Sequence, residues 1–294
     1  MNLQNTRRQL AALLILVLAG CASPSRAPIQ ATPSQPMTHV EREAEARSRG
    51  DLSSTESRVF SLAPKQLVKP DWAPVLDLEF EGKYRRDAKT SYAIKGSKLM
   101  PFEPFDSVGE LIADLSAKSP EEQVKAQYRE QTGRSLAARD NNEGRLPVEM
   151  RNVRLLAYIR AVKWVADEDQ DFHVMVCERP TGNGQPCFTT EVSGLPKSQV
   201  RTKDFRRART DLVATLQEHV DANEGKPIAP SDMRNKWAFF EPGVYVEVSG
   251  SLYLDAIHGP GTVGPRPSAR QSRDHTTPTS WEIHPVRSVR RVEE

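Results

Sequence analysis

Apolar and polar residues alternate most regularly in the C-terminal half of the chain. The alternation predicts a long strand over 153–165, further strands around 172–177, 188–192 and 244–248, and a last strand over 281–289. Between the third and fourth of these, residues 198–220 carry Phe205, Leu212, Leu216 and Val220 at helical spacing. We therefore expect three strands, one helix and two more strands.

This order of elements is the order of the OB-fold, a five-stranded, partly open Greek-key barrel. Gly250 would allow the sharp bend that the fourth strand of such a barrel needs. We expect a mainly β (β+α) domain over 151–294, with one helix between strands 3 and 4. The alternative is a generic antiparallel sheet covered by one helix.

The segment 58–150 has a mixed pattern, and we expect a small mixed α/β region packed on the barrel. Residues 75–80 alternate as a strand would, and 92–94 suggest a second short strand. Apolar residues from Val108 to Leu115 predict one helix. Ser119 as a cap, with Pro120 at the first helical position and Gly133 as a stop, predicts another.

The N-terminus carries Arg7 and Arg8 followed by an apolar run over 10–18. That run is too short to span a bilayer, which takes about 20 helical residues, so 1–20 is expected to be a removed signal peptide. Its end, Leu18-Ala19-Gly20-Cys21, resembles the lipobox of bacterial lipoproteins. The resemblance implies a diacylglyceryl group on the Cys21 sulfur and an acyl chain such as palmitate on its amine. The alternative is a plain signal peptide with a chance cysteine.

The same resemblance implies a location in the cell envelope. Residue 22 is Ala and not Asp, which by the sorting pattern of Gram-negative lipoproteins favours the outer membrane, with the protein facing the periplasm. Residues 21–57 are then a lipidated flexible tether, because 22–57 are rich in Pro, Ser, Ala, Arg and Glu and have few large apolar residues.

Overall charge points to no class of partner. Removal of residues 1–20 takes Arg7 and Arg8 from the 41 basic residues and leaves the 39 acidic residues untouched, so the formal charge of the mature chain is zero. Nucleic acid is therefore not an expected partner. A local basic stripe, Lys197, Arg201, Lys203, Arg206, Arg207 and Arg209, could meet anionic lipid or lipopolysaccharide phosphates, but a solvated helix face is the simpler reading.

Cys177 and Cys187 bracket the turn sequence Thr181-Gly182-Asn183-Gly184. Counting outward from the turn places the two cysteines opposite each other on a hairpin, where a disulfide fits. Exported proteins retain such bonds. A zinc site is the alternative, although it calls for closer cysteine spacings and more partners.

Polar residues that could carry chemistry gather at the ends of the last two strands. Asp255 and His258 follow one strand and His284 lies near the start of the next, so the three could bind a divalent metal or act as an acid–base set. Asp171 and His173 could join them as ligand-binding residues if the barrel curves round. Structural roles are the alternative: Asp255 would cap a turn, and His284 would tie its strand to a loop. Trp281 is a further ligand-binding candidate, with core packing as its alternative.

The segment from 153 to 289, ending in Trp281-Glu282-Ile283-His284-Pro285-Val286, resembles uncharacterised exported bacterial proteins with an OB-like domain. The resemblance implies a fold and no activity. We expect a non-enzymatic outer-membrane lipoprotein that presents a periplasmic binding or scaffolding module for an envelope protein, a glycan or an anionic lipid. The alternative is an exported metal-dependent, nuclease-like hydrolase that uses His258, His284 and Asp255, since staphylococcal-type nuclease shares this barrel. Apart from a possible divalent metal, no cofactor is expected.

Overall fold

The computed structural model describes residues 70–197, 199–223, 225–262, 264–265 and 277–293. Contacts divide the chain into Met1–Thr55 and Glu56–Glu294, and the described residues all belong to the second unit. The expected signal peptide, the tether and Cys21 therefore lie outside the described residues.

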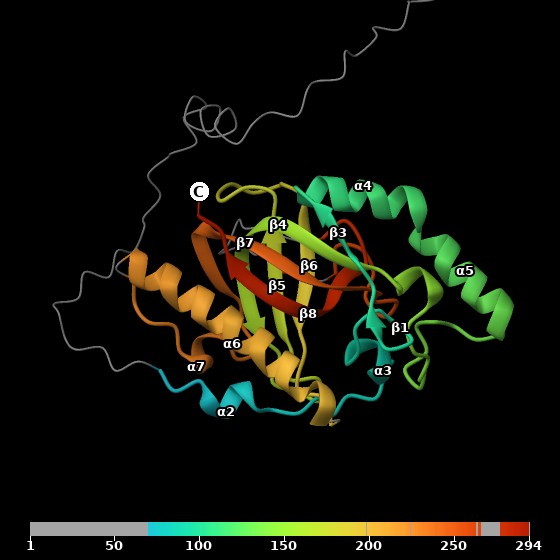
Figure 1. Ribbon diagram of the computed structural model, residues 1–294. Helices are drawn as coiled ribbons and strands as arrows, with labels where there is room; N and C mark the ends of the chain where they lie inside the picture. Colours follow the sequence, from blue (N-terminus) through green and yellow to red (C-terminus); the bar gives the residue numbers. More distant parts are fainter. Residues whose placement is uncertain (1–69, 198, 224, 263, 266–276, 294) are drawn as a thin grey trace, which may run out of the picture. The chain divides into compact units, whose positions relative to one another are not determined.

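The described residues form a mixed α/β structure whose core is mostly sheet (Figure 1). The strands are β1 (Ile94–Lys95), β2 (Lys98–Leu99), β3 (Phe102–Phe105), β4 (Asn152–Trp164), β5 (Phe172–Cys177), β6 (Cys187–Val192), β7 (Ala238–Leu254) and β8 (Trp281–Arg291). The helices are α2 (Ala73–Leu76), α3 (Arg86–Lys89), α4 (Val108–Lys118), α5 (Glu121–Thr132), the 3-10 turn η1 (Pro147–Glu149), α6 (Gln199–Ala222) and α7 (Pro230–Met233). The expected order of three strands, a long helix and two strands is confirmed in β4 to β8.

The main sheet has six strands in the order β3-β4-β5-β6-β8-β7, and β4 also pairs with β7. Five of these strands are β4 to β8. The pairs β4–β5, β5–β6, β4–β7 and β7–β8 are antiparallel, whereas β6–β8 and β3–β4 are parallel. The strand β3 was not expected from the sequence. It pairs with β4 and joins the N-terminal part of the described chain, residues 70–150, to the sheet.

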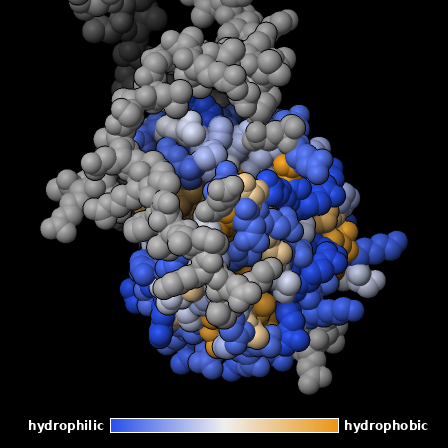
Figure 2. Space-filling view, turned by 90° about the vertical axis from the view of Figure 1, so that its left-hand side faces the viewer, coloured by the Kyte–Doolittle hydropathy of each residue, from blue (hydrophilic) through white to orange (hydrophobic). Residues whose placement is uncertain are grey.

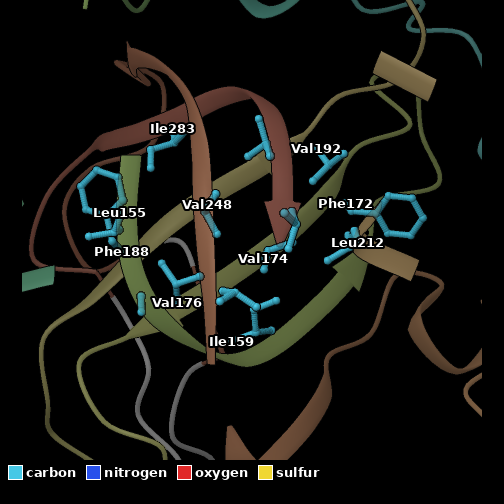
Figure 3. Packing of buried hydrophobic residues seen from close by; sticks show 14 of the residues in the cluster. Leu155, Ile159, Phe172, Val174, Val176, Phe188, Val192, Leu212, Val248 and Ile283 are labelled. Carbon is cyan, nitrogen blue, oxygen red and sulfur yellow. The ribbon is translucent and has the colours of Figure 1, made fainter. Parts of the chain in front are cut away.

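The hydrophobic core lies between the inward faces of β4 to β8 and the apolar stripe of α6. Side chains from these elements point toward one another in Figure 3, among them Ile159, Phe172, Phe188, Leu212 and Val248. Helix α4 adds Val108, Leu111 and Leu115 to the same cluster. Because each helix buries one stripe, the helices cover the sheet without interrupting its pairing.

The alternation along β4 changes phase at a β-bulge between Ile159 and Ala161. Strict alternation from Val153 along the expected strand would put Ala161 on the core face with Ile159, and the structure shows that it does not. The bulge inserts one extra residue, so Val162 and Trp164 join the core, whereas Ala161 packs with Met175 and the two cysteines on the other face. Arg160, at the bulge, is buried and donates to the carbonyl groups of Arg179, Gly182 and Phe240.

The strand expected over 75–80 is also wrong. Residues 73–76 form the short helix α2 instead, and Pro74 lies in its first turn, where the fixed backbone angle of proline is suitable. Only Glu79 makes a strand-like bridge, to Leu195. The helix expected after Ser119 is present as α5, but it begins at Glu121 with Pro120 as its N-cap.

The N-terminal region, residues 70–150, is attached to the sheet by buried Arg85 and half-buried Arg145. Arg85 forms a salt bridge with Glu149, and both side chains are fully buried. Arg85 also donates to the Leu254 carbonyl at 3.2 Å. Arg145 donates to the carbonyl groups of Leu252 and His284. These contacts place residues 85–149 directly against β7 and β8.

Figure 2 shows hydrophilic residues over most of the described part of one face, with small hydrophobic areas between them. That distribution is usual for a folded surface. The apolar residues of β4 to β8 are largely in the core clusters instead.

Candidate functional site

The expected polar residues separate into a pair and a larger cluster. The pair is Asp255 and His258, on the segment after β7, with 2.5 Å between the His258 Nδ1 and the Asp255 Oδ2. The other Asp255 carboxyl oxygen accepts the backbone N–H groups of Ile257 and His258. The turn-capping role considered for Asp255 is therefore present, and His258 is added to it.

The pair is electrostatically matched. Burial raises the pKa of Asp255, but the hydrogen bond and charge of His258 outweigh burial and lower it. The hydrogen bond to Asp255 raises the pKa of His258, with burial opposing. Since the His258 side chain is 53% exposed and the Asp255 side chain 9%, the imidazole is the part of this pair that meets solvent.

The larger cluster surrounds His284 on β8. Its Nδ1 lies 2.8 Å from the Glu191 Oε2, and its Nε2 lies 2.7 Å from the Ser193 Oγ and 3.6 Å from the Asp171 Oδ2. Asp171 precedes β5, Glu191 lies on β6 and Ser193 follows it. Three segments far apart in sequence therefore meet at one imidazole, and the side chains of His284, Asp171 and Glu191 are at most 4% exposed.

Glu191 lies between two imidazoles. Its Oε1 is 3.1 Å from the His173 Nε2, on the other side from His284. In the sheet register His173 is paired with both Lys163 on β4 and Glu191 on β6. A polar row on the outer face of the sheet thus begins at half-buried Lys163 and ends at fully buried His284.

Glu191 was missed by the sequence analysis, although a signal for it was present. The disulfide Cys177–Cys187 is confirmed, and the two cysteines are direct partners in the β5–β6 register. Four residues before Cys177 is His173, and four after Cys187 is Glu191. The predicted disulfide alone thus placed the carboxylate opposite the imidazole.

Residues of the N-terminal region complete the cluster. Lys89, in α3, donates from its Nζ to the Asp169 Oδ2 at 2.7 Å, and its carbonyl accepts the Ser193 hydroxyl at 2.9 Å. Burial lowers the pKa of Lys89, but Tyr253, Asp169 and further acidic neighbours raise it well above its ordinary value. The ammonium is thus held in its charged form among acidic groups.

The carboxyl groups of the cluster differ in charge state. Burial, with neighbouring carboxylates, raises the pKa of Asp171 and of Glu282 well above ordinary values. Burial acts the same way on Glu191, but His173 and His284 outweigh it and lower that pKa well below its usual range. Glu191 is therefore the carboxylate that the cluster keeps ionised.

Two kinds of chemistry fit parts of this arrangement. Ser193, His284 and Glu191 follow the order of a nucleophile, base and acid triad. Ser193 is only 1% exposed and its hydroxyl also contacts the Lys89 carbonyl, so these contacts do not present it to a substrate. Asp171, Glu191 and His284 each offer one donor atom, all within 4.8 Å of one another, as a metal ion would require.

Trp281 and the basic stripe occupy other positions. Trp281 is 1% exposed, belongs to the core and donates from its indole N–H to the Ser119 carbonyl. Arg209 of the stripe is fully buried, whereas Arg206 and Arg207 on the same helix face solvent. The side chain of Arg201 lies outside the described residues. The stripe is therefore not one continuous charged surface.

A different set of half-buried side chains gathers on the outer face of β4 and β5 and at the start of β7. Trp237 and Phe239 pack on a small cluster that contains the disulfide, and the Lys163 ammonium lies 5.2 Å from the centre of the Trp237 ring. We call Trp237, Phe239, Lys163 and His173 the aromatic–basic face. Its indole and its basic groups are side by side on one surface.

Comparisons with protein-family models, with curated proteins and with solved structures gave no match to this chain. Within the part of the chain that the structure describes, no helix has both the length and the apolar character to cross a membrane. The site must therefore be interpreted from its own geometry.

Proposed function

We propose that this protein is an outer-membrane lipoprotein that presents a non-enzymatic, OB-like binding module to the periplasm. The proposal of a lipid anchor rests on the Leu18-Ala19-Gly20-Cys21 motif after a short apolar run. Two or more acyl chains on Cys21 would hold the protein stably at the bilayer, whereas one chain would not.

The OB-like assignment is supported by strand pairing. Each of β4, β5, β6, β8 and β7 pairs with the next, and β7 pairs again with β4. The single long helix α6 falls between the third and fourth of these strands in the chain. Register shifts in β7 on both sides of Gly250 fit the bend that such a barrel requires.

The observation that carries the binding function is the aromatic–basic face. OB-folds bind oligosaccharides and oligonucleotides on the outer face of their second and third strands, and β5 holds the second position here. A half-buried indole can stack on a sugar ring, and Lys163 can contact anionic groups on that sugar. The His173 Nε2 is already paired with Glu191, and its Nδ1 is buried. We propose an anionic envelope glycan as the ligand.

An exported metal-dependent hydrolase has less support. Its strongest candidates, His284 and the acidic groups around it, are buried under α3 and the 85–149 segment. Asp255 and His258 are more accessible but form a closed pair with each other.

Binding can be tested with the phosphorylated oligosaccharide released from lipopolysaccharide, followed by tryptophan fluorescence. Trp237→Ala and Lys163→Ala should each weaken binding by at least tenfold, which corresponds to about 1.4 kcal/mol. Arg207→Ala, on the exposed side of α6, is the control and should bind normally. Equal weakening by Arg207→Ala, or no binding by the unaltered protein, would reject the aromatic–basic face.

The anchor is tested separately with Cys21→Ser. The variant should stay unprocessed by the lipoprotein peptidase and should lose acylation, because the thiol that receives the diacylglyceryl group is absent. Fractionation and mass spectrometry of the N-terminus measure both effects. Normal maturation with normal membrane retention would show that Cys21 is not the anchor.

A further inference from the structure

We infer that Asp171, Glu191 and His284 form a structural binding site for one divalent cation of the zinc class. Their donor atoms lie within 4.8 Å of one another, and the His284 Nε2 is 3.6 Å from the Asp171 Oδ2. Zinc bonds to nitrogen and oxygen of about 2.0–2.2 Å allow one ion to bridge the His284 Nε2 and the Asp171 Oδ2 at that separation. The Glu191 carboxylate, which contacts the His284 Nδ1 at 2.8 Å, would turn toward the ion to become its third ligand. One imidazole with two carboxylates is a donor set that Zn²⁺ accepts.

A second observation, a buried carboxyl oxygen without a partner, indicates that a cation binds beside Asp171. The Asp171 side chain is fully buried, its Oδ1 accepts the Gly194 N–H at 2.8 Å, and its Oδ2 has no hydrogen-bond partner. A buried carboxyl oxygen without a partner is costly. This oxygen lies on the side of Asp171 that is nearest His284, where a cation would satisfy it.

Surrounding groups hold the three donors in place. The Gly194 N–H donates to the Asp171 Oδ1 and so fixes the orientation of that carboxyl group. His173 donates to Glu191 from the side away from His284. Such outer partners orient metal ligands and strengthen binding. The Ser193 hydroxyl now lies against the His284 Nε2, so a cation at that nitrogen replaces one hydrogen bond, and Ser193 keeps its bond to the Lys89 carbonyl.

Lys89 works against the cation. Its ammonium is bonded to Asp169, and its charge acts on both Asp171 and Glu191. A neutral residue of similar length at position 89 would remove this repulsion. The site therefore predicts that Lys89→Met binds zinc more tightly than the natural chain, whereas an ordinary buried polar cluster predicts no such gain.

The cation would stabilise the fold and not catalyse a reaction, because all three ligand side chains are at most 4% exposed. The ligands come from before β5, from β6 and from β8. One ion would thus fasten the last strand to the central hairpin. This role goes beyond glycan binding and does not depend on it.

The test is calorimetric titration of the chelator-treated, full-length protein with ZnCl₂, together with thermal unfolding with and without the metal. We expect one Zn²⁺ per chain and a higher unfolding temperature with zinc. Asp171→Asn and His284→Gln should weaken zinc binding by tenfold or more. Asp255→Asn and His258→Gln are matched controls, since they alter the other imidazole–carboxylate pair, and both should bind zinc as the natural chain does.

Absence of stoichiometric zinc binding to the natural chain overturns the inference. Loss of binding in His258→Gln with retention in His284→Gln also overturns it, because the ion would then be held by the Asp255–His258 pair. If Asp171→Asn and His284→Gln fail to fold, the natural chain and Lys89→Met decide: the absence of tighter binding in Lys89→Met rejects the site.

Discussion

At the scale of single residues, the Asp255–His258 pair gives the protein a defined dependence on pH. The raised pKa of His258 means that its contribution to stability is complete below its ordinary value of about 6.5 and is lost as pH rises through the higher folded value. The lowered pKa of Asp255 means that its contribution is present above about 4 and is lost at lower pH. The pair therefore stabilises the fold from about pH 4 to somewhat above 6.5.

Asp255→Asn should move the pKa of His258 back down, because the hydrogen bond and negative charge that raise it are removed. An NMR titration of the imidazole resonances measures this shift. His219, on α6, has a pKa lowered chiefly by burial and is the internal control, since it has no tie to Asp255. If the His258 titration is the same in both proteins, the pair is not formed in solution.

Residue-level expectations from the sequence succeeded where one neighbour decided the outcome. Cys177 faces Cys187, and Asp255 caps its turn, because both contacts depend on a short stretch of chain. They failed where a distant segment decided. Glu191 joins His284 only through the parallel β6–β8 pairing, a contact that no local pattern indicates.

At the scale of elements, α6 was expected in nearly its true bounds, but its buried side was misjudged at one position. Arg209 was grouped with the exposed basic residues, yet its guanidinium is buried, donates to the Val75, Gln170 and Ser193 carbonyls and lies 4.7 Å from the centre of the Phe172 ring. Burial lowers the pKa of Arg209 to about 10. From sequence, a basic residue on an amphipathic helix is predicted to be exposed unless the carbonyl groups that accept its hydrogen bonds are known.

Arg209→Ala should lower the free energy of unfolding by about 2–4 kcal/mol, because three carbonyl groups lose a charged donor and a cavity forms. Arg207→Ala, two positions earlier on the exposed side, should change it by no more than about 0.5 kcal/mol. Urea denaturation of both variants measures the difference. Similar midpoints for the two would mean that Arg209 does not hold these segments together.

Strand predictions also succeeded where the strand's own sequence was sufficient, and they failed where a neighbouring strand decided the outcome. The strands β4 to β8 could be predicted because apolar and polar residues alternate along them. Strand β3 was missed because Phe102–Phe105 has only four residues and contains Pro104. Its parallel pairing with β4 supplies the order that its own sequence does not. The bulge at Arg160 was likewise invisible, since a change of phase resembles irregular polarity until the neighbouring strand is known.

At the scale of the whole molecule, the region over 58–150 and the region over 151–294 were expected as separate parts in contact. The contacts between them resemble those inside a single domain. Arg85 is fully buried with Glu149 and donates to the Leu254 carbonyl, and Arg145 donates to the His284 carbonyl. Phe80 is also buried, at 1% exposure. The N-terminal region covers the part of the outer face around Glu191 and His284, whereas Lys163 and Trp237 on the same face are half-buried.

A chain that begins at residue 151 should therefore fail to fold stably, because it loses β3, Arg85, Arg145 and the cover over Glu191 and His284. A chain that begins at residue 56, where the contacts divide, should unfold at the same temperature as a chain that begins at Cys21, the proposed mature N-terminus. Circular dichroism and thermal unfolding compare the two. Cooperative unfolding of the shorter chain at an unchanged temperature would show that 151–294 is self-sufficient.

The position of β8 has a consequence for how the chain matures. β8 fits between β6 and β7, pairing in parallel with one and antiparallel with the other. Until residues 281–291 are available, both neighbours have an open edge and the core lacks Trp281 and Ile283. If the chain emerges with its N-terminus first, the sheet therefore remains incomplete until β8 emerges, and folding can finish only then.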